Sequence, residues 1–159
     1  MSTILIATDG SEPARAAAET GIDLARALGD DVVFVAVWHP IYTSTFGVPP
    51  TYFGADVVEA EKQWALEALE AAVAEAKAAG VPARTVMLEG FAAEEICRYA
   101  TEHTVRMIVI GSHGWGAVRT MLSRSTVSGV LAHAPCPVLS GTPVGAAEER
   151  AADRERQTA

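Results

Sequence analysis

The sequence predicts an α/β domain built on a five-stranded, parallel, doubly wound sheet of strand order 3-2-1-4-5. Short apolar or β-branched runs have the length of strands, and they lie at 4–7, 32–38, 84–88, 107–110 and 137–139. Helical patterns separate each run from the next, and such alternation implies parallel pairing through right-handed crossovers. The chain has 159 residues, enough for one domain that buries roughly 70% of its unfolded surface.

The first helix is predicted from the way the first strand ends. Thr8-Asp9-Gly10-Ser11 breaks the apolar run, Ser11 can cap the helix, and Pro13 falls in its first turn. Gly29 is expected to end this helix before the second strand. The stretch 39–55, rich in proline, glycine, threonine and tyrosine, is predicted to be one long loop, and such loops are usually functional or mobile.

The next elements follow from helical spacing and polarity. Residues 56–79 predict a long amphipathic helix in which Leu66, Leu69 and Val73 form one stripe and charges lie opposite; beside the stripe lie Trp64, Ala65, Ala72 and Ala76. The run 84–88 is more polar, which favours an edge strand. A third helix is expected at 92–103, with Ile96, Cys97 and Ala100 buried, and a fourth at 125–133.

Charge and cysteine content limit the class of protein. A diffuse formal charge of −8 argues against nucleic-acid and anionic-membrane partners, which select basic patches. Cys97 and Cys136 fit no CxxC or metal spacing and are predicted to be buried thiols in a reducing cytoplasm. No targeting segment and no run of ~20 apolar residues is visible, so a soluble, cytoplasmic protein is expected. Residues 1–143 are predicted to form the domain, and 144–159 a solvated tail.

The predicted topology places a ligand crevice where the first and fourth strands end side by side. The loops 8–10 and 111–114 would meet there. Gly111 and Gly114 lack a Cβ and would let a phosphate approach the main chain, although a strand-to-loop turn can need Gly111 for itself. Ser125 and Thr126 begin a helix whose amides and hydroxyls could donate to phosphate, which is compatible with ordinary capping.

Other residues at this crevice suit a nucleoside. Asp9 would bind a ribose hydroxyl or a metal-bound water, or alternatively cap the next helix. Ala7 and Val37 would offer small apolar walls to an adenine ring. His113 would bind a phosphate or line the ring pocket, or else be an exposed loop histidine. No histidine has a partner at metal-ligand spacing, and no GxSxG, HExxH or GxxxxGK[ST] motif is present, so no metal site and no catalytic residue is predicted.

Three segments together resemble the universal stress protein family: ILIATDGS at 4–11, IVIGSHG at 108–114 and VLAHAPCPVL at 130–139. The resemblance implies an adenine nucleotide alpha hydrolase-like domain with flavodoxin-like layering. It also implies a homodimer, formed in this family largely through the last strand. Here that strand gives way to Ser140-Gly141, so the edge is short. One branch of the family binds ATP and another does not.

The ATP-binding branch has a pattern of glycine, two residues, glycine, nine residues, then glycine and Ser/Thr. Gly111, Gly114 and Ser125 match, but Arg124 stands at the third glycine. A positive φ at Arg124 would cost on the order of 1 kcal/mol, and its side chain would fill the phosphate space or, equally, bind the phosphate itself. By similarity the nucleotide would lie against Ala7, Asp9, Val37, Ile110, Gly111, His113, Gly114, Ser125 and Thr126.

Two functions from different classes remain open. The first is a stress or regulatory protein that binds ATP, with or without Mg²⁺, and has little or no catalysis because no general base for water is evident. The second is a family member without nucleotide binding that acts through dimerisation and its 39–55 loop. A flavodoxin-like electron carrier is disfavoured because 8–11 is too short and too acidic for its phosphate loop.

Overall fold

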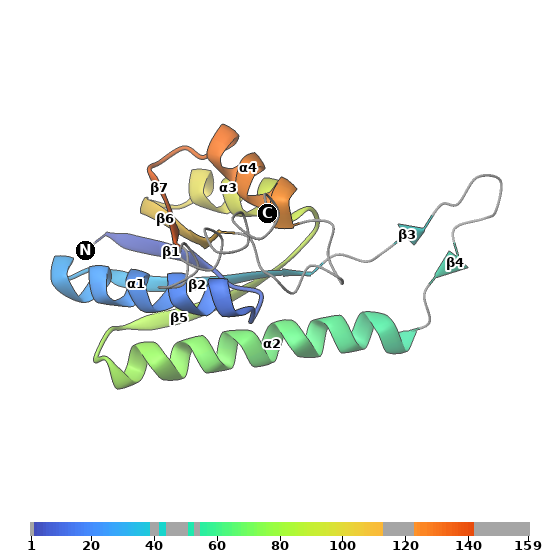
Figure 1. The fold of residues 1–159 in the computed structure, drawn as a ribbon, viewed down its shortest axis with the longest axis horizontal. Coiled ribbons are helices and arrows are strands. Elements are labelled where there is room, and N and C mark those ends of the chain that lie inside the picture. The colour runs from blue at the N-terminus through green and yellow to red at the C-terminus, as the bar shows by residue number, and fades with distance from the viewer. Residues whose placement is uncertain (1, 39–41, 44–50, 53–54, 113–122, 142–159) are drawn as a thin grey trace, which may run out of the picture.

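The computed structural model describes residues 2–38, 42–43, 51–52, 55–112 and 123–141. Its main sheet has the strand order β5-β2-β1-β6-β7, and every pair in it is parallel. The strands are β1 (Thr3–Ala7), β2 (Asp31–Trp38), β5 (Ala83–Glu89), β6 (Val105–Gly111) and β7 (Val138–Gly141). This is the predicted order 3-2-1-4-5, so the predicted fold class is confirmed (Figure 1).

Two helices cover each face of the sheet (Figure 1). α1 (Glu12–Leu28) and α2 (Ala55–Ala78) pack on one face, and α3 (Ala92–Glu102) and α4 (Ser123–His133) pack on the other. Because both faces are covered, the central strand β1 is buried along nearly its whole length. β5 pairs with β2 alone and is an edge strand, as its polar sequence predicts.

The two apolar cores follow the period-2 alternation of the strands. Ile4, Ile6 and Phe34 face α1 and α2, whereas Leu5 and Val33 face α3 and α4. The sheet therefore separates the molecule into two layers of side chains, and a residue near a strand tip belongs to one layer or the other. This division decides which of the candidate site residues can meet.

The first helix begins and ends as predicted. The Ser11 hydroxyl accepts a hydrogen bond from the Ala14 amide, and a proline occupies the first turn. Gly29 ends the helix with φ 68°, and its amide donates to the Ala25 carbonyl. Glycine suits this position because the left-handed conformation strains any residue with a Cβ.

The buried face of α2 differs from the predicted stripe. Leu69 is buried, but Leu66 is 41% exposed, so its assignment to the core was wrong. The residues that actually face the sheet are mostly alanines: Ala65, Ala68, Leu69, Ala72 and Ala76. The helix therefore faces the core mainly with small side chains, and Leu66, one position after Ala65, lies toward solvent.

The predicted long loop contains a short antiparallel ladder. β3 (Tyr42–Thr43) pairs with β4 (Thr51–Tyr52), which the sequence pattern did not indicate. Residues 39–41, 44–50 and 53–54 of this stretch lie outside the described residues, as does the predicted tail 144–159.

The two cysteines lie on the α3/α4 side of the sheet. Cys97 is buried and Cys136 is partly buried, and both are free thiols. Burial raises the pKa of both thiols, and the neighbouring Cys136 raises that of Cys97 further. Cys97 is thus the buried thiol that the sequence predicts.

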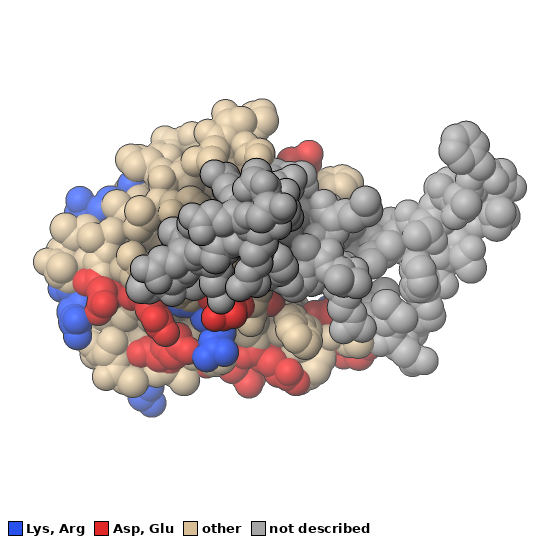
Figure 2. Space-filling model, in the orientation of Figure 1, with Lys and Arg blue, Asp and Glu red and all other residues tan. Residues whose placement is uncertain are grey.

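Acidic side chains gather along α1 and α2 in the view of Figure 2. Glu67 and Glu70, for example, lie on the exposed side of α2. None of the helices in the described ranges combines the length and the apolar character needed to cross a membrane.

Candidate functional site

The tips of β1 and β6 lie side by side at the carboxyl end of the sheet. Ile6 pairs with Val109 in the parallel register, so Ala7 and Ile110 are the next neighbours along the two strands. Beyond β1, the Thr8 amide donates to the Val35 carbonyl of β2 at 2.9 Å. The structure therefore brings together the strand tips that the sequence predicts to frame the crevice.

Three predicted apolar residues share one face at these tips. Ala7 and Ile110 are 8% and 6% exposed and belong to the core under α3 and α4. Val37 is partly buried and packs against the same core, and α4 contributes Val127 to it. Ala7, Val37 and Ile110 thus lie in the same layer of side chains, on the α3/α4 side of the sheet.

Asp9 sits in the turn between β1 and α1 with an exposed side chain. Its Oδ1 accepts a hydrogen bond from the Ser11 amide at 3.0 Å, and the Thr8 hydroxyl accepts one from the Gly10 amide at 3.3 Å. Gly10 has φ +76°, a conformation that favours glycine. The helix cap is Ser11, so Asp9 closes the turn before the helix rather than capping it.

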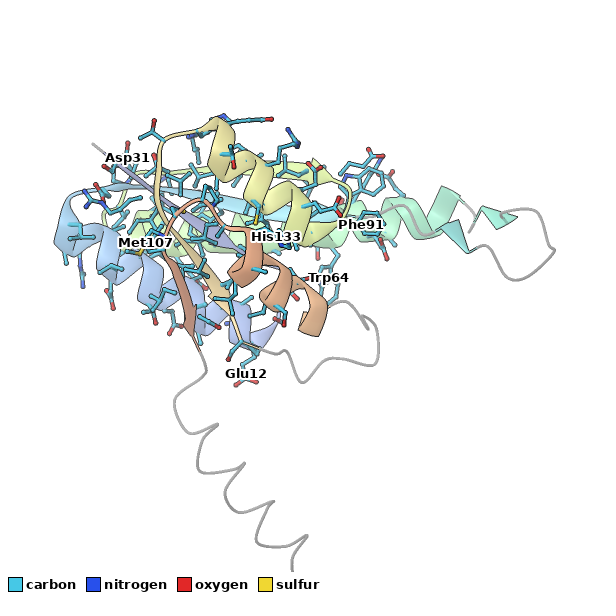
Figure 3. The ribbon with its side chains drawn as sticks, turned by 90° about the horizontal axis from the view of Figure 1, so that it is seen from above. Glu12, Asp31, Trp64, Phe91, Met107 and His133 are labelled. Atoms are coloured by element: carbon cyan, nitrogen blue, oxygen red, sulfur yellow. The ribbon has the colours of Figure 1, made fainter. Side chains whose placement is uncertain are left out.

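A tryptophan that sequence reasoning did not select contacts this turn. Nε1 of Trp64, on α2, donates to the Asp9 carbonyl at 2.8 Å. Figure 3 shows Trp64 and Phe91 at the same end of the molecule, opposite Asp31, where β2 begins. The contact spans 55 residues of sequence, so no local pattern predicts it. The only sequence signal was a large aromatic residue within a helix rich in alanine.

An open hollow of about 330 Å³ lies on the other side of the turn, between α1 and α2. It is lined by Thr8, Gly10, Arg15, Ala18, Trp64, Glu67, Ala68, Ala71, Ala72 and Glu75. Its volume is at the lower end of the range for small-molecule pockets. Among the described residues, Ala7, Val37 and Ile110 do not line it, because they face the opposite layer.

Gly111 has a packing role that its sequence pattern does not show. It is the last residue of β6, and a Cβ added to it would lie 2.7 Å from the backbone carbon and oxygen of Pro13. Its φ is not among the positive values found at described glycines. The alternative that the chain needs glycine here for its own structure is therefore supported, but by close contact with α1 rather than by the turn.

The residues predicted for the phosphate end are only partly described. His113 and Gly114 lie outside the described residues, and Arg124 and Ser125 fall in the first turn of α4, with their side chains outside them. Helical backbone has negative φ, so the strain considered for Arg124 does not arise. Thr126 follows them in the same helix. Among the described residues, no group of three or more His, Cys, Asp or Glu side chains could hold a metal ion.

Comparison with known proteins gives a consistent picture. The model of the universal stress protein family matches residues 1–140. A universal stress protein of Thermus aquaticus is 37% identical over 139 residues, which cover 86% of this chain and 96% of that protein. A crystal structure from the same family in Burkholderia pseudomallei has a TM-score of 0.68 at 30% identity and covers 87% of this chain and 94% of the other.

Three further solved structures of this fold carry a nucleotide. One from Arabidopsis thaliana has AMP bound (TM-score 0.65, 22% identity, 89% and 92% coverage). One from Archaeoglobus fulgidus is in complex with dAMP (0.62, 24%, 89% and 97%). A third universal stress protein is in complex with cAMP (0.64, 21%, 87% and 95%). At these identities, the likeness to the present chain concerns the fold.

Proposed function

The chain belongs to the universal stress protein family, and on this premise we propose that it binds an adenine nucleotide where β1 and β6 end. One observation carries the proposal: the apolar face of Ala7, Val37 and Ile110 lies at the same strand tips as the exposed Asp9 carboxylate. An adenine ring suits the apolar face, and a ribose hydroxyl can donate to the carboxylate.

The ligands of the related structures support recognition of the adenosine part. AMP, dAMP and cAMP share an adenine, a sugar and one phosphate, and they differ at the 2′ position and in whether the phosphate is cyclised. The groups common to these ligands, which three separate structures bind, are the base, the sugar and one phosphate, and this supports a site that recognises the adenosine part, that is, the base and the sugar. In the present chain those groups would meet Ala7, Val37, Ile110 and Asp9.

The ligand in our proposal is ATP, with or without Mg²⁺. Its phosphates would extend past Gly111 toward His113 and Gly114, and toward the amides at the start of α4, where Ser125 and Thr126 lie. Helix N-termini favour anions because the helix dipole is positive there. Magnesium would neutralise phosphate charge and would be held mainly by the phosphates. The protein would act as a stress-response or regulatory switch through occupancy, with little or no hydrolysis.

Titration calorimetry with ATP and Mg²⁺, with AMP as a second ligand, tests the proposal. Saturable binding of ATP is expected, and mass analysis of ligand released from denatured protein should find an adenine nucleotide. The proposal fails if neither nucleotide produces a binding isotherm at millimolar concentration.

Gly114→Val is expected to weaken ATP binding by at least about tenfold, because the branched side chain would occupy the space beside the main chain that a phosphate needs. AMP, which carries fewer phosphates, should lose less affinity than ATP. Ala27→Val is a suitable control, since Ala27 is exposed in the last turn of α1, at the opposite end of the sheet from this loop. Unaltered ATP affinity in Gly114→Val would remove this loop from the site.

Arg124 is the feature that favours a second function, namely a family member that has lost nucleotide binding and acts through dimerisation. Its helical position argues that the side chain is tolerated, and we expect it to pair with a phosphate. Arg124→Gly should then lower ATP affinity severalfold, and Arg124→Lys should retain most of it. A gain of affinity in Arg124→Gly would instead show that the guanidinium blocks the site and would support the second function.

We also propose that the chain forms a homodimer. β7 lies at the edge of the sheet beside β6 and has four residues, and its Leu139 is 37% exposed. Sedimentation velocity measures the oligomeric state directly.

A further inference from the structure

We propose that Trp64 is a positioning residue of the nucleotide site, which holds the turn Thr8-Asp9-Gly10-Ser11 in the shape that presents the Asp9 carboxylate. The inference rests on the proposed function, because it assigns to Trp64 the conformation of the turn that would meet the ribose. Trp64 itself lies on the α1/α2 side of the turn and would not touch the nucleotide.

The contacts of Trp64 are specific to the backbone of this turn. Its indole Nε1–H donates to the Asp9 carbonyl at 2.8 Å. A Cβ added to Gly10 would lie 3.4 Å from the same Nε1 and 3.3 Å from the Ala68 Cβ, so the turn rests directly on two residues of α2. Glycine at position 10 therefore permits both the left-handed φ and this contact.

Burial does not explain where the indole lies. Trp64 is 60% exposed, and most of its ring area stays in contact with water. A tryptophan that gains little from the hydrophobic effect is held by its directional bond, and a bond that joins residues 55 positions apart fixes α2 against the turn. The arrangement thus stabilises a local conformation more than it stabilises the fold as a whole.

The turn needs an external support when a ligand is bound. Its internal hydrogen bonds are few, and one of them uses Oδ1 of Asp9, which accepts from the Ser11 amide. A ribose hydroxyl would donate to the same carboxylate, which has acceptor sites left on both oxygens. The Trp64 bond engages the Asp9 carbonyl instead, so it remains available while the carboxylate binds ligand.

The same part of α2 contacts the tip of the neighbouring strand. Nζ of Lys62 lies 4.3 Å from the ring centroid of Trp38, the last residue of β2, and Trp38 directly follows Val37. Residues 62 and 64 of α2 thereby contact the end of β2 and the turn that follows β1, and these are two of the three strands that would carry the base-contacting residues. A shift of α2 would therefore also shift the residues at these two strand ends.

Trp64→Phe tests this role, because it removes the donor and keeps an aromatic ring. ATP affinity is expected to fall by about three- to tenfold, the size of effect that one lost hydrogen bond produces. Hydrogen exchange of the Gly10 and Ser11 amides should become faster by a similar factor, while exchange in β1 and the midpoint of urea unfolding stay close to those of the unaltered chain. Leu66→Ala is the matched control, since Leu66 is exposed on the same helix and should change none of these quantities.

The outcomes separate the two proposals. If the unaltered chain binds ATP, and Trp64→Phe matches it in both affinity and exchange at the turn, the positioning role is overturned and the proposed function stands. A change in hydrogen exchange of the same size throughout the sheet would show that Trp64 stabilises the whole fold. That result would also overturn the positioning role. If the unaltered chain binds no adenine nucleotide, the proposed function is overturned, and the positioning role with it.

Discussion

Gly111→Ala is expected to lower the free energy of unfolding by about 2–3 kcal/mol, the upper part of the range for overpacked sites. The added Cβ would lie 2.7 Å from the Pro13 carbon and oxygen and 2.8 Å from the Ala14 nitrogen. These are backbone atoms in the first turn of α1, so no side chain can turn aside to make room. Urea unfolding without nucleotide measures the effect.

The control for this change is Gly141→Ala. Gly141 pairs with Gly111 in the β6–β7 register, and a Cβ there would lie 3.4 Å from the Ala17 Cα, close to ordinary contact. Its effect should stay below about 1 kcal/mol. Should the two variants unfold at the same urea concentration, the close approach of α1 to β6 would not be a feature of the folded protein.

Arg106→Ala is expected to lower the free energy of unfolding by about 2–3 kcal/mol, because it leaves a buried carboxylate without its cation. The Asp30 side chain is 3% exposed and forms an ion pair with Arg106 Nε. Its Oδ1 also accepts from the Ser2 amide at 3.1 Å, which retains part of the stabilisation. The Arg106 side chain is 44% exposed, so its guanidinium loses less hydration in the ion pair than the Asp30 carboxylate does. Urea unfolding at neutral pH measures the loss.

Arg98→Ala provides the comparison, since it also removes a paired arginine. Arg98 pairs with Glu95 and Glu102 on the exposed side of α3, where water screens the attraction. The unfolding midpoint should therefore move little. If Arg106→Ala moved the midpoint no further than Arg98→Ala does, the Asp30 carboxylate would have to be solvated in solution.

The glycine pattern that resembles the ATP-binding branch thus combines two requirements. Gly111 makes room for α1 whether or not a nucleotide binds, and Gly114 is proposed to make room for phosphate. A substitution at Gly111 changes the stability of the fold, so a loss of ATP binding in such a variant would not report on the ligand contact alone. Gly114 and Trp64 are the positions at which binding can be separated from stability.

Much of the fold could be predicted because the deciding signals are local. Ser11 and Gly29 mark the ends of α1 through the hydrogen bonds and the φ values that helix ends require. The strands of the sheet alternate with helices, which leaves a parallel, doubly wound arrangement as the expected result. The polar run at 84–88 indicated an edge strand, and β5 is one.

The errors and omissions share one physical cause. Helical spacing showed that α2 has a buried side, but Leu66 and the alanines beside it are all apolar, and only the packing of α2 in the folded protein shows that the alanines are the buried ones. The contact of Trp64 was missed, and the role of Gly111 was interpreted differently, because both depend on tertiary packing. Their partners, Asp9 and Pro13, lie far away in sequence.

The sequence by itself determined the order of the elements, the family and the two strand tips at which a nucleotide would bind, because periodicity, capping and turn chemistry act over a few residues. Only the tertiary structure decided that Ala7, Val37 and Ile110 share one layer, that α1 leaves no room for a Cβ on Gly111, and that Trp64 rests on the Asp9 turn. Those are properties of packing, and packing depends on which distant surfaces the chain brings within contact distance.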